Sequence, residues 1–162
     1  FGQGISITPL RLAVSYCALA NGGKIYKPYI VEKIINPDGT IKEILPQVLS
    51  ENIINQQTSE LIKKMLNSVT EIGFSKAARV SGYYVAGKTG TAQMPTKGGG
   101  YTDSETWQTF AGFGPAYDPK FVAIIKFDKP GVKEASISAA PIFSKLAKYI
   151  FDYWQIPTQR DD

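Results

Sequence analysis

Residues 83–93, YYVAGKTGTAQ, carry the strongest structural and chemical pattern in the chain. The first four residues are bulky and β-prone and predict a short strand, and 87–91 then add a cation, two hydroxyls and two glycines. Because side chains alternate along a strand, Thr89 and Thr91 share one face, and Lys88 leaves from the other face and reaches round on its flexible stem. Glycines let another backbone or a substrate lie close to the strand. We therefore predict an edge strand used for recognition.

Two known motifs match this stretch. Residues 82–89 fit the phosphate loop G-x-x-x-x-G-K-[ST], and residues 88–90 fit the K-T-G strand of penicillin-recognising serine enzymes. A phosphate loop needs a buried strand before it and a helix that begins at its Lys-Thr. Here the preceding segment is SKAARVS, the loop is bulky, and the helix would contain Gly90 and end by Pro95. The context favours K-T-G over a phosphate loop or a plain glycine-containing edge strand.

Four blocks of sequence carry a resemblance to one protein family. They are FGQGISITPLRLA at 1–13, YYVAGKTGTAQ at 83–93, TFAGFGPAYDPKFVAIIKFDKP at 109–130 and SAAPIFSKLAKYIFDYWQIP at 138–157. In this order they resemble the C-terminal part of the transpeptidase domain of a class B penicillin-binding protein, which cross-links cell-wall peptidoglycan. The resemblance implies that residues 1–162 are one incomplete domain, with the upstream motifs and any membrane anchor outside this chain.

Apolar spacing predicts three helices. Thr8 caps the first, which begins at Pro9, forms part of the core and stops at 21–23, and the second covers 55 to about 70 with its apolar face on the sheet. The third begins near Ala140 and closes the back of the sheet. The predicted apolar faces are Leu10, Ala13, Val14, Cys17 and Ala18; Thr58, Leu61, Ile62, Met65 and Val69; and Phe143, Leu146, Ala147, Ile150 and Trp154.

The strand pattern predicts an antiparallel meander of 83–86 and its continuation, 107–114 and 121–127, with a glycine-rich mobile loop at 95–104. A small exposed hairpin is predicted from the β-prone run 25–35, the turn 36–39 and a returning strand at 40–44, and a frayed tail at 158–162. Together these elements form an α+β fold. The resemblance sharpens this to an incomplete penicillin-binding protein and serine β-lactamase-like transpeptidase fold, with an antiparallel sheet packed between helices.

Composition excludes several classes of site. The 162 residues are 43% apolar and 20% charged, as in one globular domain, and they include no histidine, so histidine relays and histidine metal sites are excluded. Cys17 is the single cysteine, which excludes an internal disulfide, and we predict it to be a small core residue. The net charge of +4 comes without a basic stripe, so no nucleic-acid partner is predicted. Without histidine or a cysteine cluster no metal is predicted, and no cofactor is predicted either. No signal peptide or membrane-length apolar run occurs, and we expect this piece to be soluble.

The family's serine chemistry needs S-x-x-K, S-x-N and K-T-G. No serine in the chain has lysine three residues later; those checked are Ser6, Ser15, Ser50, Ser59, Ser68, Ser75, Ser81, Ser104, Ser136, Ser138 and Ser144. The letters S-x-N occur at 50–52, but before a predicted helix and after the first family block, so we assign them to a loop or cap. The nucleophile is therefore expected upstream, and this chain alone is expected to be inactive.

The roles that the resemblance implies are limited to the matched strand. Lys88 and Thr91 are the catalytic candidates, and Lys88, Thr89, Gly90 and Thr91 form the substrate-binding set. Lys88 would supply positive charge, both threonine hydroxyls would bind a substrate carboxylate, and the Thr91 N–H would form half of an oxyanion hole.

The function implied is a peptidoglycan D,D-transpeptidase that is acylated by β-lactams. Its implied partners are peptidoglycan stem peptides, β-lactam antibiotics, the upstream part of the same protein and other cell-wall synthesis proteins. The implied location is a bacterial cell membrane, with the catalytic domain on the outer face. A non-hydrolytic β-lactam or wall-peptide sensor of the same fold is the main alternative, and a P-loop nucleotide-binding protein is a distant third.

Overall fold

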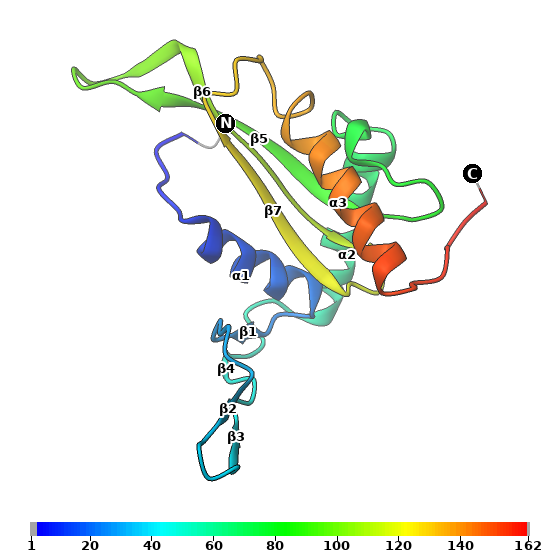
Figure 1. The fold of residues 1–162 in the computed structure, drawn as a ribbon. Coiled ribbons are helices and arrows are strands. Elements are labelled where there is room, and N and C mark those ends of the chain that lie inside the picture. Colours follow the sequence, from blue (N-terminus) through cyan, green and yellow to red (C-terminus); the bar gives the residue numbers. More distant parts are fainter. Residues whose placement is uncertain (1–2, 162) are drawn as a thin grey trace.

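The computed structural model describes residues 3–161 as an α+β domain, which confirms the predicted fold class (Figure 1). The elements run in the order α1 (Pro9–Ala20), β1 (Ile25–Tyr26), β2 (Lys33–Ile35), β3 (Ile41–Glu43), β4 (Val48–Ser50), α2 (Gln56–Glu71), η1 (Lys76–Ala78), β5 (Ala86–Pro95), β6 (Tyr101–Gly114), β7 (Phe121–Asp128) and α3 (Ala139–Tyr153). Helix α3 packs on one face of the β5–β6–β7 sheet and α1 packs against β6 and β7 on the other face. Phe1, Gly2 and Asp162, which belong to the first family block and the predicted tail, lie outside the described residues.

The main sheet is the predicted antiparallel meander, in the order β5-β6-β7. The register pairs Lys88 with Ala111 and Thr91 with Gln108, and β6 pairs with β7 along the whole of β7. Two strand boundaries were predicted wrongly. Tyr83 lies before the strand, in an isolated bridge to Val80, and β5 and β6 extend to Pro95 and from Tyr101, so only residues 96–100 of the predicted 95–104 loop lie outside the strands.

An aromatic core lies between the sheet and α3. Phe110 from β6 and Phe143 from α3 are fully buried with ring centroids 4.5 Å apart, and Tyr83 stacks on Phe151 at 4.2 Å. Phe143 and Ala147 were predicted to face the core and do so. The same prediction for Trp154 is wrong, since Trp154 is 51% exposed and Phe151 is fully buried instead. Phe143, Ala147 and Phe151 recur every four residues, so they form one straight stripe along the helix.

Helix α1 has the predicted ends but is less buried than predicted. The Arg11 N–H donates to Thr8 Oγ1 over 3.2 Å at the N-cap, and the Asn21 N–H donates to the Cys17 carbonyl at the other end. Within the helix only Ala18 and Ala20 are fully buried, whereas Leu10 is exposed and Cys17 is half-buried. The prediction that Leu10 and Cys17 are core residues is therefore wrong.

Helix α2 packs the opposite way round from its predicted orientation. Leu61 and Met65, predicted to face the sheet, are 57% and 59% exposed, and the buried positions are polar: Ser59, Lys63, Asn67 and Thr70. Among the strands of the main sheet, α2 contacts chiefly β5, which is an edge strand. A strand edge presents backbone N–H and C=O groups rather than an apolar face, so polar side chains are needed opposite it.

The segment between α1 and α2 forms the predicted exposed hairpin, which extends away from the main sheet (Figure 1). Its distal part pairs β2 with β3, with Ile35 opposite Ile41 and the turn closed by the Asn36 N–H and the Thr40 carbonyl. The predicted strand 25–35 is broken into β1 and β2, and β1 pairs with β4. The 50–52 S-x-N letters therefore lie at the base of this arm.

The C-terminal tail is bound to the domain and not frayed as predicted. The Tyr83 hydroxyl donates to the Ile156 carbonyl over 2.7 Å, and the Gln159 N–H donates to the Gly82 carbonyl over 2.8 Å. The Arg160 guanidinium lies 4.7 Å from the centre of the Tyr84 ring and 2.7 Å from Glu71 Oε2. This result could not be predicted from composition, which shows that the tail is polar but not that its residues have specific partners.

Candidate functional site

The outer edge of β5 presents a regular series of backbone groups. β5 pairs only with β6 among the described strands, so alternate residues of β5 direct their N–H and C=O groups away from the sheet. The bonds at Val85 and Thr89 fix which residues these are: the Val85 carbonyl accepts from α2 and the Thr89 carbonyl accepts from Lys88 Nζ. By the same alternation Thr91 directs its N–H to the outer edge, where a ligand can accept it.

Lys88 reaches round to this edge as predicted. Its Nζ lies 2.9 Å from the Thr89 carbonyl oxygen and 3.3 Å from Thr89 Oγ1. The Lys88 side chain is exposed, and within residues 3–161 it forms no ion pair with an acidic side chain. A lysine held by neutral oxygens alone keeps its positive charge available to an anion at the strand edge.

The two threonines share one side of the strand, which confirms the predicted alternation. The Thr91 hydroxyl accepts the Ala135 N–H over 3.1 Å, and this bond leaves the hydroxyl proton to be donated. Thr89 Oγ1 lies 3.5 Å from Oγ of Ser75, which is fully buried. These hydroxyls, the Lys88 ammonium and the Thr91 N–H together make an edge rich in donors, which suits a carboxylate or an oxyanion.

The glycines of the motif are required by the packing of β5 on β6. A Cβ added at Gly87 would lie 2.5 Å from Phe110 Cζ and 2.8 Å from the Ala111 carbonyl oxygen. A Cβ at Gly90 would lie 2.6 Å from Thr109 Oγ1. The close neighbour at both positions is therefore the adjacent strand, and the absence of these side chains is explained without a substrate.

A groove of about 630 Å³ lies beside the N-terminal segment, residues 3–12, and the distal half of β5. Gly90 and Thr91 form part of one wall, and the opposite wall includes Ile5, Ile7 and Leu12. Across the entrance, Gln3 Nε2 donates to Gln93 Oε1 over 2.7 Å. The groove thus places apolar surface next to the donor-rich edge.

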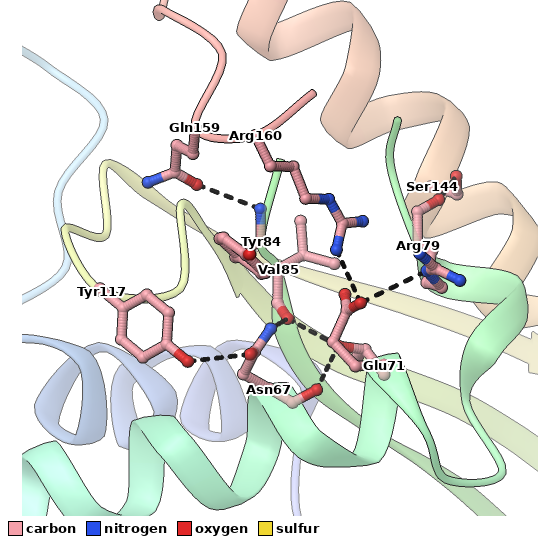
Figure 2. A network of polar contacts seen from close by, with 10 residues as sticks. Asn67, Glu71, Arg79, Tyr84, Val85, Tyr117, Ser144, Gln159 and Arg160 are labelled. Carbon is pink, nitrogen blue, oxygen red and sulfur yellow. Dashed lines mark hydrogen bonds and ion pairs between the residues drawn. The ribbon is translucent and has the colours of Figure 1, made fainter. Parts of the chain in front are cut away.

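Polar residues of α2 that the sequence analysis did not single out reach the start of β5 (Figure 2). Asn67 Nδ2 and Thr70 Oγ1 lie 2.8 Å and 2.7 Å from the Val85 carbonyl oxygen. The signal that was present in the sequence is the spacing of polar residues at 59, 63, 67 and 70, three of them small, which places them on one side of a helix. The predicted orientation of α2 followed the more apolar stripe on the opposite side of the helix instead.

The geometry excludes the phosphate loop. Lys88 and Thr89 lie inside a ten-residue strand, and no helix begins at them. A phosphate loop binds through amides that converge at a helix N-terminus, so the nucleotide-binding alternative is wrong.

An α+β domain with a donor-rich K-T-G edge strand defines the class of site, and comparisons with known proteins give the family. Residues 1–148 match the family model described as penicillin binding protein transpeptidase domain. Stage V sporulation protein D of Bacillus subtilis is 38% identical over 152 residues, or 91% of this chain and 23% of that protein. Penicillin-binding protein PbpB of Mycolicibacterium smegmatis is 36% identical over 172 residues, or 99% of this chain and 26% of that protein.

The fold comparison agrees with the sequence comparison. Penicillin binding protein 3 of Mycobacterium tuberculosis, solved in complex with ampicillin, superposes with a TM-score of 0.85 at 34% identity, over 99% of this chain and 38% of that one. The chain belongs to the penicillin-binding protein transpeptidase domain family. It spans about a quarter of the length of the curated relatives named above, which it covers to 23% and 26%. Within residues 3–161 no helix has the length and apolar character needed to cross a bilayer.

Proposed function

We propose that this chain is the C-terminal part of a peptidoglycan D,D-transpeptidase domain, and that β5 is its substrate-binding and oxyanion strand. The observation that carries the proposal is the outer edge of β5, where the Thr91 N–H, the Lys88 ammonium and two hydroxyls come together. Relatives in the family include proteins named peptidoglycan D,D-transpeptidase, and a related structure contains ampicillin.

In this function the nucleophilic serine and its lysine base come from the upstream part of the same protein. The Thr91 N–H and the N–H of that serine hold the developing oxyanion, and Thr89 and Thr91 bind the terminal carboxylate of a stem peptide or a β-lactam. Gly90 lets the chain pass Thr109 closely, so that both threonines keep their register. Losing one oxyanion donor costs on the order of 2.7 to 4 kcal/mol of transition-state stabilisation.

The proposed setting follows from the substrate. Peptidoglycan is cross-linked outside the cytoplasmic membrane, so the domain acts on the outer face, anchored through the upstream part of the protein and in contact with other cell-wall synthesis proteins. The name of a relative, peptidoglycan D,D-transpeptidase FtsI homolog of Mesostigma viride, supports a role in wall synthesis.

The test is acylation of the parent protein by benzylpenicillin, followed as an increase in intact mass. Lys88→Ala is expected to slow acylation about 10- to 100-fold, since a charge-assisted hydrogen bond contributes about 1.5 to 3 kcal/mol. Lys64→Ala is the control, because Lys64 is an exposed lysine on α2, away from the strand edge. Equal rates for Lys88→Ala and the wild type would contradict the assignment of Lys88.

A second assay separates the transpeptidase from a sensor. The parent protein is incubated with donor and acceptor stem peptides, and cross-linked product is measured by mass spectrometry. Turnover supports the transpeptidase. Acylation by penicillin without any peptide cross-linking would favour the binding or sensor function in its place.

A further inference from the structure

The carbonyl of Val85, one residue before β5, is held by two side chains of α2 (Figure 2). Asn67 Nδ2 donates to it over 2.8 Å, and Thr70 Oγ1 lies 2.7 Å away. The Thr70 hydroxyl has one proton, which it can donate either to the Val85 carbonyl or to the Asn67 backbone carbonyl, 2.8 Å from Thr70 Oγ1. All these groups are buried, so water does not reach the Val85 carbonyl, and its partners are the Asn67 amide and, when its proton turns that way, the Thr70 hydroxyl.

The orientation of the Asn67 amide is determined by its neighbours. The Val85 carbonyl accepts only, so the amide must turn its NH₂ group toward it. Its Oδ1 then faces Tyr117, whose hydroxyl donates to it over 3.0 Å. Tyr117 follows β6, so the network joins α2, the start of β5 and the end of β6.

The C-terminal tail also bonds to the end of α2 and to the residue before Val85. Gln159 Oε1 accepts the Tyr84 N–H over 3.1 Å, one residue from Val85. Arg160 Nη1 donates to Glu71 Oε2 over 2.7 Å, and Arg79 Nε lies 3.5 Å from the same oxygen (Figure 2). The end of α2 and the start of β5 are therefore joined to segments far away in the sequence.

We propose that Asn67 and Thr70 are positioning residues for the acyl-transfer site, acting through the Val85 carbonyl to set where Lys88 and Thr91 lie. The inference rests on the proposed function and extends it to residues that touch no substrate. Val85, Thr89 and Thr91 direct their backbone groups to the same edge, because they are separated by even numbers of residues.

Lys88 lies only three residues beyond Val85, or about 10 Å at the rise per residue of a strand. A change in the position of Val85 is carried along β5, because hydrogen bonds to β6 hold the strand as one unit. Misplacement of reacting groups by about 1 Å can cost about a hundredfold in rate. The bonds from Asn67 and Thr70 to the Val85 carbonyl therefore affect the rate of acyl transfer, although neither side chain touches the substrate.

The test compares two variants of α2 in the parent protein. Thr70→Val removes the hydroxyl next to Val85 at nearly constant shape. Ser59→Ala is the matched control: Ser59 is equally buried and its Oγ donates over 2.6 Å to the Leu19 carbonyl, at the end of α1 and away from β5. Each change removes one buried hydroxyl donor from the same helix, so their effects on Tm should be similar.

The expected result is a fall of about tenfold or more in the rate of acylation by benzylpenicillin for Thr70→Val, and a change of less than about twofold for Ser59→Ala. Thr70→Ser, which restores the hydroxyl, should recover the rate. Hydrogen exchange of peptides covering 86–91 should become faster in Thr70→Val only. Acylation of Thr70→Val as fast as that of Ser59→Ala, or unchanged exchange of 86–91 in Thr70→Val, would overturn the proposal.

The exchange measurement also keeps the two proposals apart. If the wild-type parent is not acylated by penicillin, the proposed function fails. Unchanged exchange of 86–91 in Thr70→Val refutes the positioning role whether or not the wild type is acylated.

Discussion

Gly87→Ala tests the packing that places the K-T-G strand. An alanine Cβ at this position would lie 2.5 Å from Phe110 Cζ, 2.6 Å from Phe110 Cε1 and 2.8 Å from the Ala111 carbonyl oxygen. The phenyl ring is fully buried against Phe143, and the oxygen belongs to the backbone of β6. Neither neighbour can move away freely, so β5 must shift outward.

The magnitude follows from two opposing effects. Overpacking of a tight interior typically costs about 1 to 3 kcal/mol, and a contact with backbone places this site at the upper end. Replacing glycine by alanine also restricts the unfolded chain, which returns about 0.4 to 1 kcal/mol. The net loss is about 2 kcal/mol. For a domain of 150 to 250 residues this lowers Tm by about 4 to 8 °C.

The assay is thermal unfolding followed by circular dichroism, with Gly98→Ala as the control. Gly98 has no atom within 4 Å of an added Cβ, so its substitution should leave Tm unchanged or slightly raised. A Gly87→Ala protein with the same Tm as the Gly98→Ala control would refute the described register of β5 on β6. A lowered Tm accompanied by slower penicillin acylation would connect this packing to the site.

Two further predictions concern features that the structure corrected. Burial raises the pKa of the Cys17 thiol, so at pH 8 less of it is thiolate than in a free cysteine, and its alkylation by iodoacetamide should be slower than that of glutathione until the chain is unfolded in urea; equal rates in the folded protein would contradict this. Met65→Gln on the exposed face of α2 should change the free energy of unfolding by less than about 0.5 kcal/mol, whereas Asn67→Leu, which leaves the buried Val85 carbonyl with one donor fewer, should cost about 1 to 3 kcal/mol in urea unfolding. A larger loss for Met65→Gln than for Asn67→Leu would restore the orientation of α2 predicted from its apolar stripe.

The features predictable from sequence are those set by local chemistry. Thr8 and Pro9 begin α1 where capping rules place them, and the β-prone runs around 107–114 and 121–127 pair as short connections require. The alternation of Thr89, Thr91 and Lys88 follows from strand geometry and is independent of the rest of the fold. The proposed roles of these residues stay predictions, because they depend on a substrate and an upstream serine.

The features that could not be predicted depend on contacts between distant segments. Composition indicates that residues 158–162 are polar, but not that Arg160 meets Glu71 or that Gln159 meets Tyr84. The core position of Phe151 likewise depends on Tyr83, which lies far away in the sequence. A local pattern ranks residues by hydrophobicity, whereas burial is decided by which partner lies opposite.

Helix α2 shows the physical reason most clearly. An apolar stripe predicts the buried side of a helix only when the opposing surface is apolar, such as a sheet face or another helix. Here the opposing surface is largely the edge of β5, whose carbonyl at Val85 must find donors once water is excluded. A leucine opposite that carbonyl would bury an unsatisfied polar group, so Asn67 and Thr70 are the more stable choice.

The same edge then has two uses along its length. The outward carbonyl of Val85 is bonded to α2, whereas that of Thr89 is bonded, within residues 3–161, only to the flexible Lys88 side chain. Helix α2 has ended before this point, at Glu71, and Ser75 of the following segment contacts the Thr89 side chain rather than its backbone edge. If α2 were extended along β5, its side chains would satisfy the Thr89 and Thr91 groups as well, and the edge would be closed to any ligand. The end of the helix therefore determines how much of β5 remains available for recognition.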